Sequence, residues 1–285
     1  MKQLAIISGK GGTGKTVITS AFASIADNKV IVDCDVDAAN LHLMLNPKIL
    51  EHNIFKSGFT ASIDRSKCTR CLKCLKNCRF NAITKNLTID SIACEGCAFC
   101  YNLCPVGAIT LEENIAGEWF ISETKYGPFV HAKLGIAEEN SGKLVSLIRK
   151  QAQTLAKEQN KNLIIIDGPP GIGCQVIATL ANIDSALIVT EPTVSGLHDA
   201  KRVIELAKHF TIPIMMLINK YDLNLAMTKN IEQYCEQQNI ILVGKIKFDT
   251  DIVNAVTNKK PIMNIANIKL KEQIQKIWHT TYNNL

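Results

Sequence analysis

The chain has 285 residues, of which 47% are hydrophobic and 20% are charged, and this composition excludes an intrinsically disordered protein. Its length predicts one large domain together with a smaller one. The formal net charge of +6 would suit an acidic partner only if its eleven cysteine thiols stay neutral.

The cellular compartment follows from the apolar runs and the cysteines. Apolar runs such as 163–166 and 186–189 are far shorter than the roughly 18–20 residues that span a bilayer. The first ten residues lack the apolar segment and the cleavage site of a signal peptide. We therefore expect a cytoplasmic protein without a stable membrane anchor. Because thiols stay reduced there, the cysteines indicate metal binding rather than disulfides.

A short apolar strand is expected at residues 3–7, and it leads directly into a glycine-rich loop. Residues 9–16 satisfy the P-loop pattern G-x4-G-K-[ST], and the apolar periodicity of 17–26 predicts the helix that follows. In such a loop backbone N–H groups close on phosphates, while Lys15 would contact the β- and γ-phosphate oxygens and Thr16 would bind Mg²⁺. The sequence therefore predicts a nucleoside triphosphate site.

Lys10, the second residue of this loop, gives the chain a resemblance to the deviant Walker-A ATPases of the MinD/ParA group. In that family the corresponding lysine crosses a dimer interface and contacts the phosphates of the partner subunit. The resemblance implies a homodimer that forms with nucleotide and a slow ATPase that a partner stimulates. A solvated loop lysine is the plain alternative.

An acidic segment follows the second expected strand, at 30–32. Asp33, Asp35 and Asp37, followed by Asn40-Leu41, resemble the D-x-D…N-L segment of the same family. Ligands bind at the carboxyl ends of parallel strands, so we expect Asp35 to orient the attacking water, with Asp37 as a second candidate. The resemblance also makes Asp35 the catalytic aspartate. Asp33 is expected to support the water shell of Mg²⁺.

An internal repeat with an offset of 26 residues occupies 62–110. Each copy predicts a strand, a cysteine loop, a short helix and a strand, and each carries C-x2-C-x2-C-x3-C, which is typical of bacterial ferredoxins with [4Fe–4S] clusters. Two zinc sites are the alternative, but zinc usually binds paired C-x2-C knuckles. The repeat therefore predicts two [4Fe–4S] clusters.

The fourth cysteine of each ferredoxin run binds the other cluster. The first cluster is expected on Cys68, Cys71, Cys74 and Cys104. The second is expected on Cys78, Cys94, Cys97 and Cys100. One departure is that Arg79 follows the first run, where Pro105 follows the second. Two clusters with their thiolates would lower the net charge to roughly +2, so no specific nucleic-acid partner is expected.

The strand predicted at 163–166 ends at Asp167-Gly168-Pro169-Pro170-Gly171, which resembles the Walker-B strand and switch of the family. Asp167 would hold Mg²⁺ through water, with Thr16 bound to the ion directly. The predicted magnesium residues are Thr16, Asp33, Asp35 and Asp167. Another strand is predicted at 186–189.

A further strand, at 214–218, ends at Asn219-Lys220-Tyr221-Asp222. Asn219 is expected to bond the purine ring. The segment also looks like the N-K-x-D with which GTPases recognise guanine, where the Asp222 carboxylate would accept hydrogen bonds from the base. The MinD resemblance favours ATP. The predicted nucleotide-binding residues are Gly9, Lys10, Gly11, Gly12, Thr13, Gly14, Lys15, Thr16, Asn219 and Asp222, and the predicted catalytic residues are Lys10, Lys15, Asp35 and Asp37.

These elements predict an α/β protein of the P-loop NTPase class, with a mostly parallel, doubly wound sheet. Its ATPase domain would comprise 1–57 and 114–285, with a small α+β domain, similar to bacterial ferredoxins, inserted at 58–113. A strand pair is expected within 119–134, a helix from Asn140 to about 159, and a last helix within 265–282 that packs on the core.

Three cysteines lie outside the repeat. Cys34 and Cys174 are expected to be small packing residues rather than ligands, and Cys235 is expected to have no special role. Cys174 attracts more interest, because a dimeric ATPase could bridge a metal there.

Three functions remain open. The first couples nucleotide-dependent dimerisation to electron delivery, with a metalloenzyme or other redox protein as client. The second is an ATPase that assembles iron–sulfur or other metal clusters and inserts them into a client. The third is a spatial organiser of the MinD/ParA type with clusters as sensors. Ligation by eight cysteines favours the first, because a cluster that is handed over needs exposed, incomplete ligation.

Overall fold

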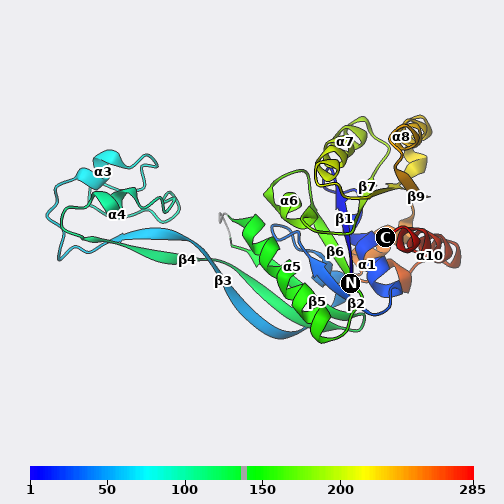
Figure 1. The fold of residues 1–285 in the computed structure, drawn as a ribbon, viewed down its shortest axis with the longest axis horizontal. Coiled ribbons are helices and arrows are strands. Elements are labelled where there is room, and N and C mark those ends of the chain that lie inside the picture. The colour runs from blue at the N-terminus through cyan, green and yellow to red at the C-terminus, as the bar shows by residue number, and fades with distance from the viewer. Residues whose placement is uncertain (136–139) are drawn as a thin grey trace. The chain divides into compact units, whose positions relative to one another are not determined.

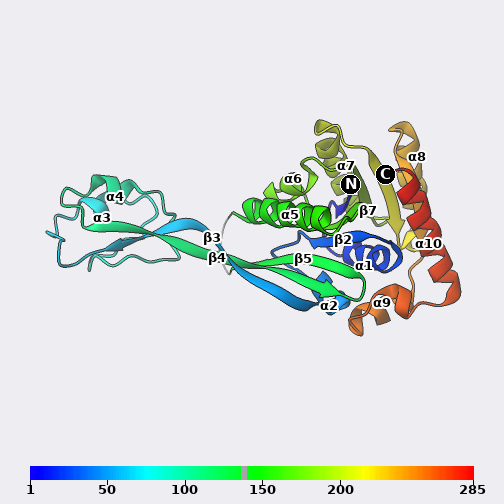
Figure 2. The ribbon, with the colours of Figure 1, turned by 60° about the horizontal axis from the view of Figure 1, so that its bottom comes forward.

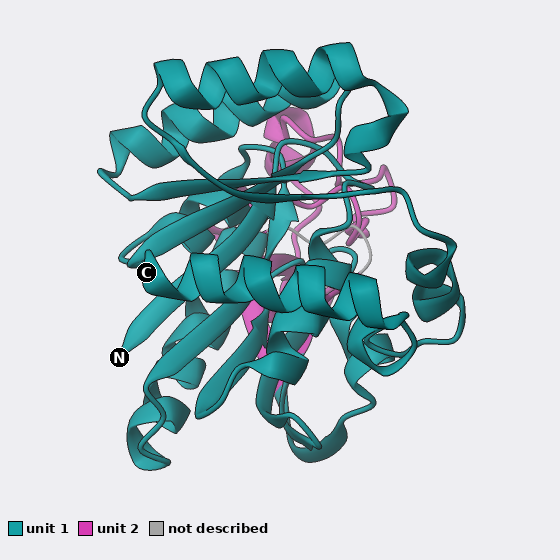
Figure 3. Ribbon diagram, turned by 90° about the vertical axis from the view of Figure 1, so that its right-hand side faces the viewer, with its two compact units in different colours: residues 1–53, 119–133, 141–285 teal, residues 54–118, 134–140 magenta. Residues whose placement is uncertain are grey.

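The computed structural model describes residues 1–135 and 140–285 and contains two compact units (Figures 1 and 3). Unit 1 comprises Met1–Asn53, Trp119–Lys133 and Ser141–Leu285, and unit 2 comprises Ile54–Glu118 and Leu134–Asn140. The predicted insert at 58–113 lies inside unit 2.

A nine-stranded sheet has the strand order β3-β4-β5-β2-β6-β1-β7-β8-β9. From β5 to β9 every neighbouring pair is parallel. These seven strands are β1 (Lys2–Ser8), β2 (Lys29–Asp33), β5 (Gly127–Leu134), β6 (Leu163–Pro170), β7 (Ser185–Thr190), β8 (Ile214–Asn219) and β9 (Ile241–Ile246). Their nearly continuous apolar runs suit strands that are covered on both faces. The prediction of a mostly parallel α/β fold is therefore confirmed.

Helices cover both faces of the parallel strands (Figure 2). On one face lie α1 (Lys15–Ile25), α9 (Thr250–Thr257) and α10 (Ile268–Asn283), and on the other lie α5 (Ser141–Glu158), α6 (Cys174–Leu180) and α7 (Val194–His209). The remaining helical segments of unit 1 are α2 (Leu41–Leu45), α8 (Leu225–Gln237) and the short 3-10 turns η1 (Tyr221–Leu223) and η2 (Ile262–Asn264). The sheet is therefore doubly wound.

The last helix, α10, packs on the core as predicted. Its buried face comprises Leu270, Ile274, Ile277, Trp278 and Thr281. The ring centroids of Trp278 and Phe22, a residue of α1, are 4.9 Å apart. No helix in the described part of the chain combines the length and the apolar character that crossing a membrane requires.

Two long strands connect the units. β3 (Lys48–Ile63) and β4 (Ile109–Thr124) have sixteen residues each, and each begins in one unit and ends in the other. Only Lys125 and Tyr126 separate β4 from β5, a loop short enough to require an antiparallel hairpin. The strand pair predicted within 119–134 is therefore present, but β4 is much longer than the sequence suggested.

Unit 2 repeats its backbone with the 26-residue offset. Helices α3 (Lys73–Asn77) and α4 (Phe99–Leu103) have five residues each. The preceding residues, Leu72 and Ala98, are both left-handed with φ of 60°. Few residues other than glycine adopt this conformation, so its recurrence shows that the two copies share one loop structure.

The two copies also exchange equivalent hydrogen bonds. The Asp64 N–H donates to the Ala108 carbonyl at 2.8 Å, and the Asp90 N–H donates to the Ala82 carbonyl at 2.7 Å. Each bond joins one copy to the other, so the two copies form a pseudo-symmetric pair.

A buried histidine, His131 on β5, makes the stability of unit 1 dependent on pH. The residue is 8% exposed, its ring stacks on Phe120 and Phe129, and Ser122 lies 3.2 Å from its Nε2. Burial, with a smaller contribution from nearby His42, lowers the pKa of His131 from 6.5 to about 4. Above pH 6.5 the ring is neutral in both folded and unfolded chains. Between pH 6.5 and 4 only the unfolded chain takes up the proton, so stability is lost as the pH falls.

We expect the melting temperature of unit 1 to fall across this window, with a loss of at most about 3 kcal/mol from His131. Changing His131→Phe together with Ser122→Ala, so that no hydroxyl loses its partner, should flatten the fall. Thermal unfolding from pH 7 to 4.5 by circular dichroism measures both slopes. Equal slopes in the two proteins would assign the acid sensitivity to other groups.

Candidate nucleotide site and cysteine cavities

The P-loop connects β1 to α1 in unit 1. Gly12 and Gly14 have φ of 79° and 96°, and a Cβ on Gly14 would lie 2.5 Å from Asn219 Nδ2. A larger residue at position 14 would therefore be strained and would also collide with Asn219. The loop thus closes against the end of β8, with the Lys15 side chain buried at the start of α1.

A cavity of about 1050 Å³ opens beside this loop. It is lined from the P-loop side by Gly11, Gly12, Gly14, Lys15 and Thr16, and from the segment after β2 by Asp35, Asp37, Ala38 and Asn40. Pro169, Pro170, Gly173, Cys174 and Gln175 line it from the β6–α6 side. The predicted P-loop, D-x-D and Walker-B segments therefore meet at one cavity, at the carboxyl ends of β1, β2 and β6.

Two buried carboxylates lie behind the cavity. Thr19 Oγ1 donates to Asp167 Oδ1 at 2.7 Å, while Asp33 accepts the N–H groups of Asp35 and Leu41 at 3.1 and 3.2 Å. Burial raises the pKa of Asp167 to about 6, against the opposing effect of Lys15. Burial and the neighbouring Asp167 also raise the pKa of Asp33 well above its usual value. A divalent cation would relieve this repulsion.

The magnesium roles of these aspartates remain predictions. Asp33 uses its oxygens to order the loop after β2, and the described lining of the cavity does not include it. Asp35 does line the cavity, and burial raises its pKa while nearby Lys15 lowers it. Asp37 accepts a hydrogen bond from Gln175 Nε2 at 2.5 Å. Of the three, Asp35 is thus placed best to meet a water molecule in the cavity.

Lys10 is held within its own chain. Its Nζ lies 2.5 Å from Glu191 Oε1, and it donates to Thr193 Oγ1 and Ser195 Oγ at 3.3 Å each. Lys220 Nζ lies 3.3 Å from the second oxygen of the same carboxylate. Although partial burial opposes it, hydrogen bonds from Lys10 and Lys220 keep the pKa of Glu191 below its usual value. Lys10 therefore has a partner in the single chain as well as its predicted place in a dimer.

The expected base-recognition residues make contacts within the protein. Asn219 Nδ2 donates to the Thr13 carbonyl at 2.8 Å, and Asn219 Oδ1 accepts the Lys220 N–H at 3.0 Å. Asp222 Oδ1 accepts the Phe248 N–H at 2.7 Å. The described lining of the cavity includes neither residue. Their roles towards a purine stay predictions, and their observed effect is to brace the P-loop and the loop after β9.

Sequence reasoning missed Glu191, Gln175 and Ser141. Glu191 directly follows the carboxyl end of β7, which was an available signal. Gln175 and Ser141 gave none, because their places in the site depend on where the first turns of α6 and α5 lie. Ser141 Oγ is 3.4 Å from Cys174 Sγ.

In the described part of unit 2, two cavities are lined by the predicted cysteine sets, and Cys74 lines both of them. The first, a narrow cavity of about 20 Å³, is lined by Cys68, Cys71, Cys74 and Cys104 among others. The Arg70 N–H donates to Cys68 Sγ at 3.4 Å, and the Ala108 N–H donates to Cys104 Sγ at 3.3 Å. Cys104 thus lies with the first run, although it belongs to the second.

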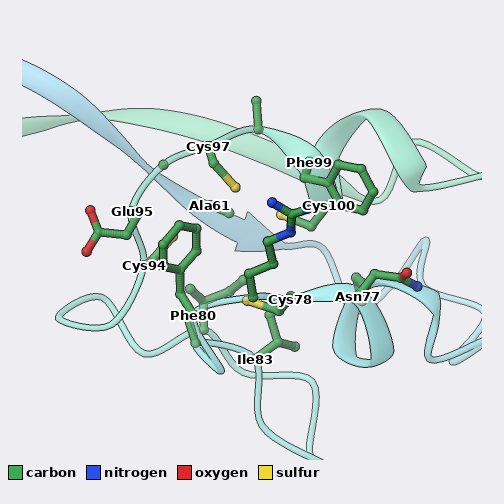
Figure 4. A pocket seen from close by; sticks show the side chains of 16 residues that line it. Ala61, Asn77, Cys78, Phe80, Ile83, Cys94, Glu95, Cys97, Phe99 and Cys100 are labelled. Atoms are coloured by element: carbon green, nitrogen blue, oxygen red, sulfur yellow. The ribbon is translucent and has the colours of Figure 1, made fainter.

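The second cavity, of about 430 Å³, is lined by Cys78, Cys94, Cys97 and Cys100 (Figure 4), and also by Cys74. Gly96, with φ of 59°, lets the loop pass close to Phe59, because a Cβ there would lie 2.2 Å from the Phe59 carbonyl oxygen. Here Cys78 lies with the second run. The structure therefore groups the cysteines in the interleaved pattern.

The donor chemistry of both cavities suits iron–sulfur clusters. Within the described residues, no three His, Cys, Asp or Glu side chains are arranged to hold a metal ion. Each thiolate of a [4Fe–4S] cluster binds a different iron, so its ligands surround a cube rather than a single ion. Each cavity has the four cysteines that such a cube requires, and N–H···S hydrogen bonds are present at Cys68 and Cys104 of the first set. The first cavity, of about 20 Å³, has room for about one water molecule and would have to widen to hold a cube.

Neighbouring thiols contribute to the raised pKa of two cysteines at the cavities, Cys74 and Cys100. Burial raises the pKa of Cys74, and the neighbouring Cys68 and Cys71 add to the rise. Burial likewise raises the pKa of Cys100, with a contribution from Cys94 and Cys97. At Cys104 a slight desolvation is outweighed by backbone N–H groups that lower the pKa.

The other cysteines lie apart from these cavities. Cys34 and Cys235 are buried, and burial raises the pKa of Cys235 to about 11 and that of Cys34 further still. Cys174 is exposed at the nucleotide cavity. None of the eleven forms a disulfide.

A comparison with known protein families identifies one family whose model matches most of the chain. Residues 4–262 match the model described as "CobQ/CobB/MinD/ParA nucleotide binding domain". A similar protein is the uncharacterised MJ0578 of Methanocaldococcus jannaschii, which is 35% identical over 283 residues, covering 97% of this chain and 95% of the relative. The septum site-determining protein MinD of Bacillus subtilis is 23% identical over 268 residues, covering 91% and 81%.

Solved structures show the same fold. The septum site-determining protein MinD from Pyrococcus horikoshii, complexed with Mg-ADP, aligns with a TM-score of 0.61 at 18% identity, covering 98% of this chain and 95% of the other. MinD in the MinC:MinD complex of Aquifex aeolicus aligns with a TM-score of 0.59 at 18% identity, covering 100% and 97%.

Proposed function

This chain belongs to the CobQ/CobB/MinD/ParA family of nucleotide-binding domains, and from this premise we propose that it is an ATP-hydrolysing iron–sulfur protein. In the proposal, ATP-dependent formation of a homodimer governs electron delivery to a partner metalloenzyme. Membership of the family establishes a nucleotide-binding domain. ATP hydrolysis, the iron–sulfur clusters and the client protein are the parts that we propose.

One observation carries the iron–sulfur part. The cysteines around each cavity of unit 2 come from both copies of the repeat, Cys104 with the first run and Cys78 with the second. A pair of simple zinc knuckles would have no need of this exchange, because each run would supply its own ligands. Two interleaved sets of four thiols favour two [4Fe–4S] clusters.

The nucleotide site supports ATP hydrolysis through residues at the large cavity of unit 1. The P-loop N–H groups and Lys15 would bind the phosphates, and Thr16 would bind Mg²⁺ with Asp167 behind it. Asp35, which lines the cavity, would orient the attacking water. Lys10 would leave Glu191 and cross to the phosphates of the partner subunit, where it would stabilise charge that develops in the transition state.

Clusters bound in unit 2 would supply one-electron transfer. The cysteine thiolates would bind the iron atoms of the clusters. Backbone N–H groups, such as those of Arg70 and Ala108, donate hydrogen bonds to the cysteine sulfur atoms. Such hydrogen bonds tune the reduction potential of a cluster.

The test is the metal content of protein purified without oxygen. We expect about eight iron and about eight sulfide atoms per chain. Cys235→Ala, which alters a buried cysteine of unit 1, should keep the same content. Stoichiometric zinc in place of iron would overturn the cluster proposal while leaving the ATPase proposal intact.

A spatial organiser is the second candidate, and the similarity to septum site-determining MinD proteins favours it. In that case a localised partner would set the position of the protein, and the clusters would act as sensors. Redox titration with and without a non-hydrolysable ATP analogue separates the two functions. A reduction potential that shifts with nucleotide supports gated electron delivery, and by linkage reduction must then shift ATP affinity by the same free energy. An ATPase that loads clusters into a client remains the other alternative.

A further inference from the structure

The basic segment, defined as residues 65–85, is a concentration of positive charge on unit 2. It contains seven basic residues and no acidic residue, and all seven are exposed. They are Arg65, Lys67, Arg70, Lys73, Lys76, Arg79 and Lys85. Their number exceeds the net charge of +6 on the whole chain, so the rest of the protein is close to neutral.

The second copy of the repeat shows that the fold does not need this charge. Residues 91–111, the equivalents with the 26-residue offset, contain no Lys or Arg and one acidic residue, Glu95. The equivalent positions hold Ser91, Ala93, Gly96, Phe99, Asn102, Pro105 and Leu111. Since both copies form the same loop and five-residue helix, neither the backbone nor a set of four thiols requires basic neighbours.

Part of the segment borders the first cysteine cavity. Lys73 lines that cavity, and Arg70 lies between Cys68 and Cys71, the latter exposed. Val106, 43% exposed, lines the same cavity. An apolar group among charged ones resembles the centre and rim of a protein interface.

Most of the basic side chains of the segment have no acidic partner in the described part of the chain. Lys67 Nζ lies 3.4 Å from Asp64 Oδ2. The other six basic side chains form no ion pair within the part of the chain that the structure describes. These six side chains are therefore available to form ion pairs with an external partner.

We propose that the basic segment is the docking surface for a small acidic redox protein whose carboxylates surround its own redox group. The identity of this partner as a redox protein rests on the proposed iron–sulfur function. Complementary charge speeds encounter and orients the partners, and transient redox complexes use small interfaces of this kind. Lys73 lines the first cysteine cavity and Arg79 lines the second, so a partner on this segment would lie beside both cysteine sets.

A nucleic acid would also be attracted by positive charge, but the arrangement fits it less well. Proteins that bind single strands combine basic grooves with aromatic side chains on which bases stack. The basic segment contains a single aromatic residue, Phe80, while Phe99 and Tyr101 lie in the second copy, which has no basic residue. Arg79, Phe80 and Phe99 share the lining of the second cavity, but the described lining of the first cavity, which includes Lys73, contains no aromatic side chain.

The test measures binding of a flavodoxin with an acidic surface to the full chain, purified without oxygen, at about 10 mM and about 150 mM salt. We expect binding at low salt that weakens roughly tenfold or more at high salt. The triple variant Arg65→Gln, Lys76→Gln, Lys85→Gln should weaken it at least about fivefold. None of these three side chains lines a cysteine cavity, so iron content should not change.

The matched control, Lys229→Gln, Lys269→Gln, Lys276→Gln, removes the same charge from exposed lysines of unit 1 and should change affinity less than about twofold. Carbodiimide should cross-link the probe to lysines of the basic segment.

Three results would overturn the docking surface: no binding at low salt, equal losses in the two triple variants, or tighter binding of a single-stranded RNA through the same residues. Iron is measured on the same samples, so the proposals separate. Iron-loaded protein that fails to bind defeats the docking surface alone. Protein without iron that binds through the segment defeats the iron–sulfur function alone.

Discussion

Replacing Cys78 by alanine should halve the iron content, from about eight to about four atoms per chain. In the structure Cys78 lines the cavity of Cys94, Cys97 and Cys100, although its own run is the first one. Its loss should therefore remove the second cluster and leave the first. Iron and sulfide analysis after purification without oxygen measures this.

Double variants distinguish the interleaved ligand sets from runs that each bind their own cluster. Cys78→Ala with Cys94→Ala should still keep about four iron atoms, because both residues serve one site. Cys78→Ala with Cys68→Ala should lose nearly all iron, because each site then lacks one ligand. The reverse pattern would show that each run binds its own cluster. Cys235→Ala is the control for a cysteine outside the repeat.

Replacing Lys10 by alanine should lower ATP turnover about 10²-fold or more while changing ATP affinity only about threefold. The physical reason is that a lysine supplied across a dimer acts on charge that develops in the transition state. Steady-state kinetics give the turnover and equilibrium binding of nucleotide gives the affinity. Lys229→Ala, on the exposed surface of α8, is the control. Full activity of the Lys10 variant, with turnover per subunit independent of protein concentration, would refute action across a dimer.

The ion pair between Lys10 and Glu191 should oppose dimer formation. Lys10 Nζ and Glu191 Oε1 lie 2.5 Å apart within one chain, and this contact must break before Lys10 reaches a partner subunit. Glu191→Gln should therefore shift dimerisation with a non-hydrolysable ATP analogue to lower protein concentration, as sedimentation velocity would show. Unchanged or weaker dimerisation would mean that Glu191 instead positions Lys10 for the dimer.

Much of the nucleotide site could be predicted because its parts depend on local sequence. The glycines of the P-loop and the apolar strands before each acidic segment are recognised from residues that are close together in the sequence. The strands predicted at 3–7, 30–32, 163–166, 186–189 and 214–218 are present as β1, β2, β6, β7 and β8.

The sequence predicted two features poorly, because neither produces a recognisable pattern in neighbouring residues. β3 mixes polar, charged and apolar residues over sixteen positions and is largely exposed, so no hydrophobic pattern marked its length. Asn219 and Asp222 follow a strand as expected, yet their side chains are engaged by Thr13 and Phe248, which lie far away in sequence or in another loop. A motif identifies such a residue, but it does not show which other groups of the protein form hydrogen bonds with its side chain.

The sequence by itself determined the positions of the apolar strands, the P-loop and the doubled cysteine run, since each depends on a few neighbouring residues. Only the tertiary structure decided which distant residues meet. Gln175 reaches Asp37 across 138 positions, and Lys10 contacts Thr193 across 183. These pairings follow from the order in which the strands lie in the sheet, β2 beside β6 and β1 beside β7. That order is set by burial of both sheet faces over the whole unit, which no local pattern encodes.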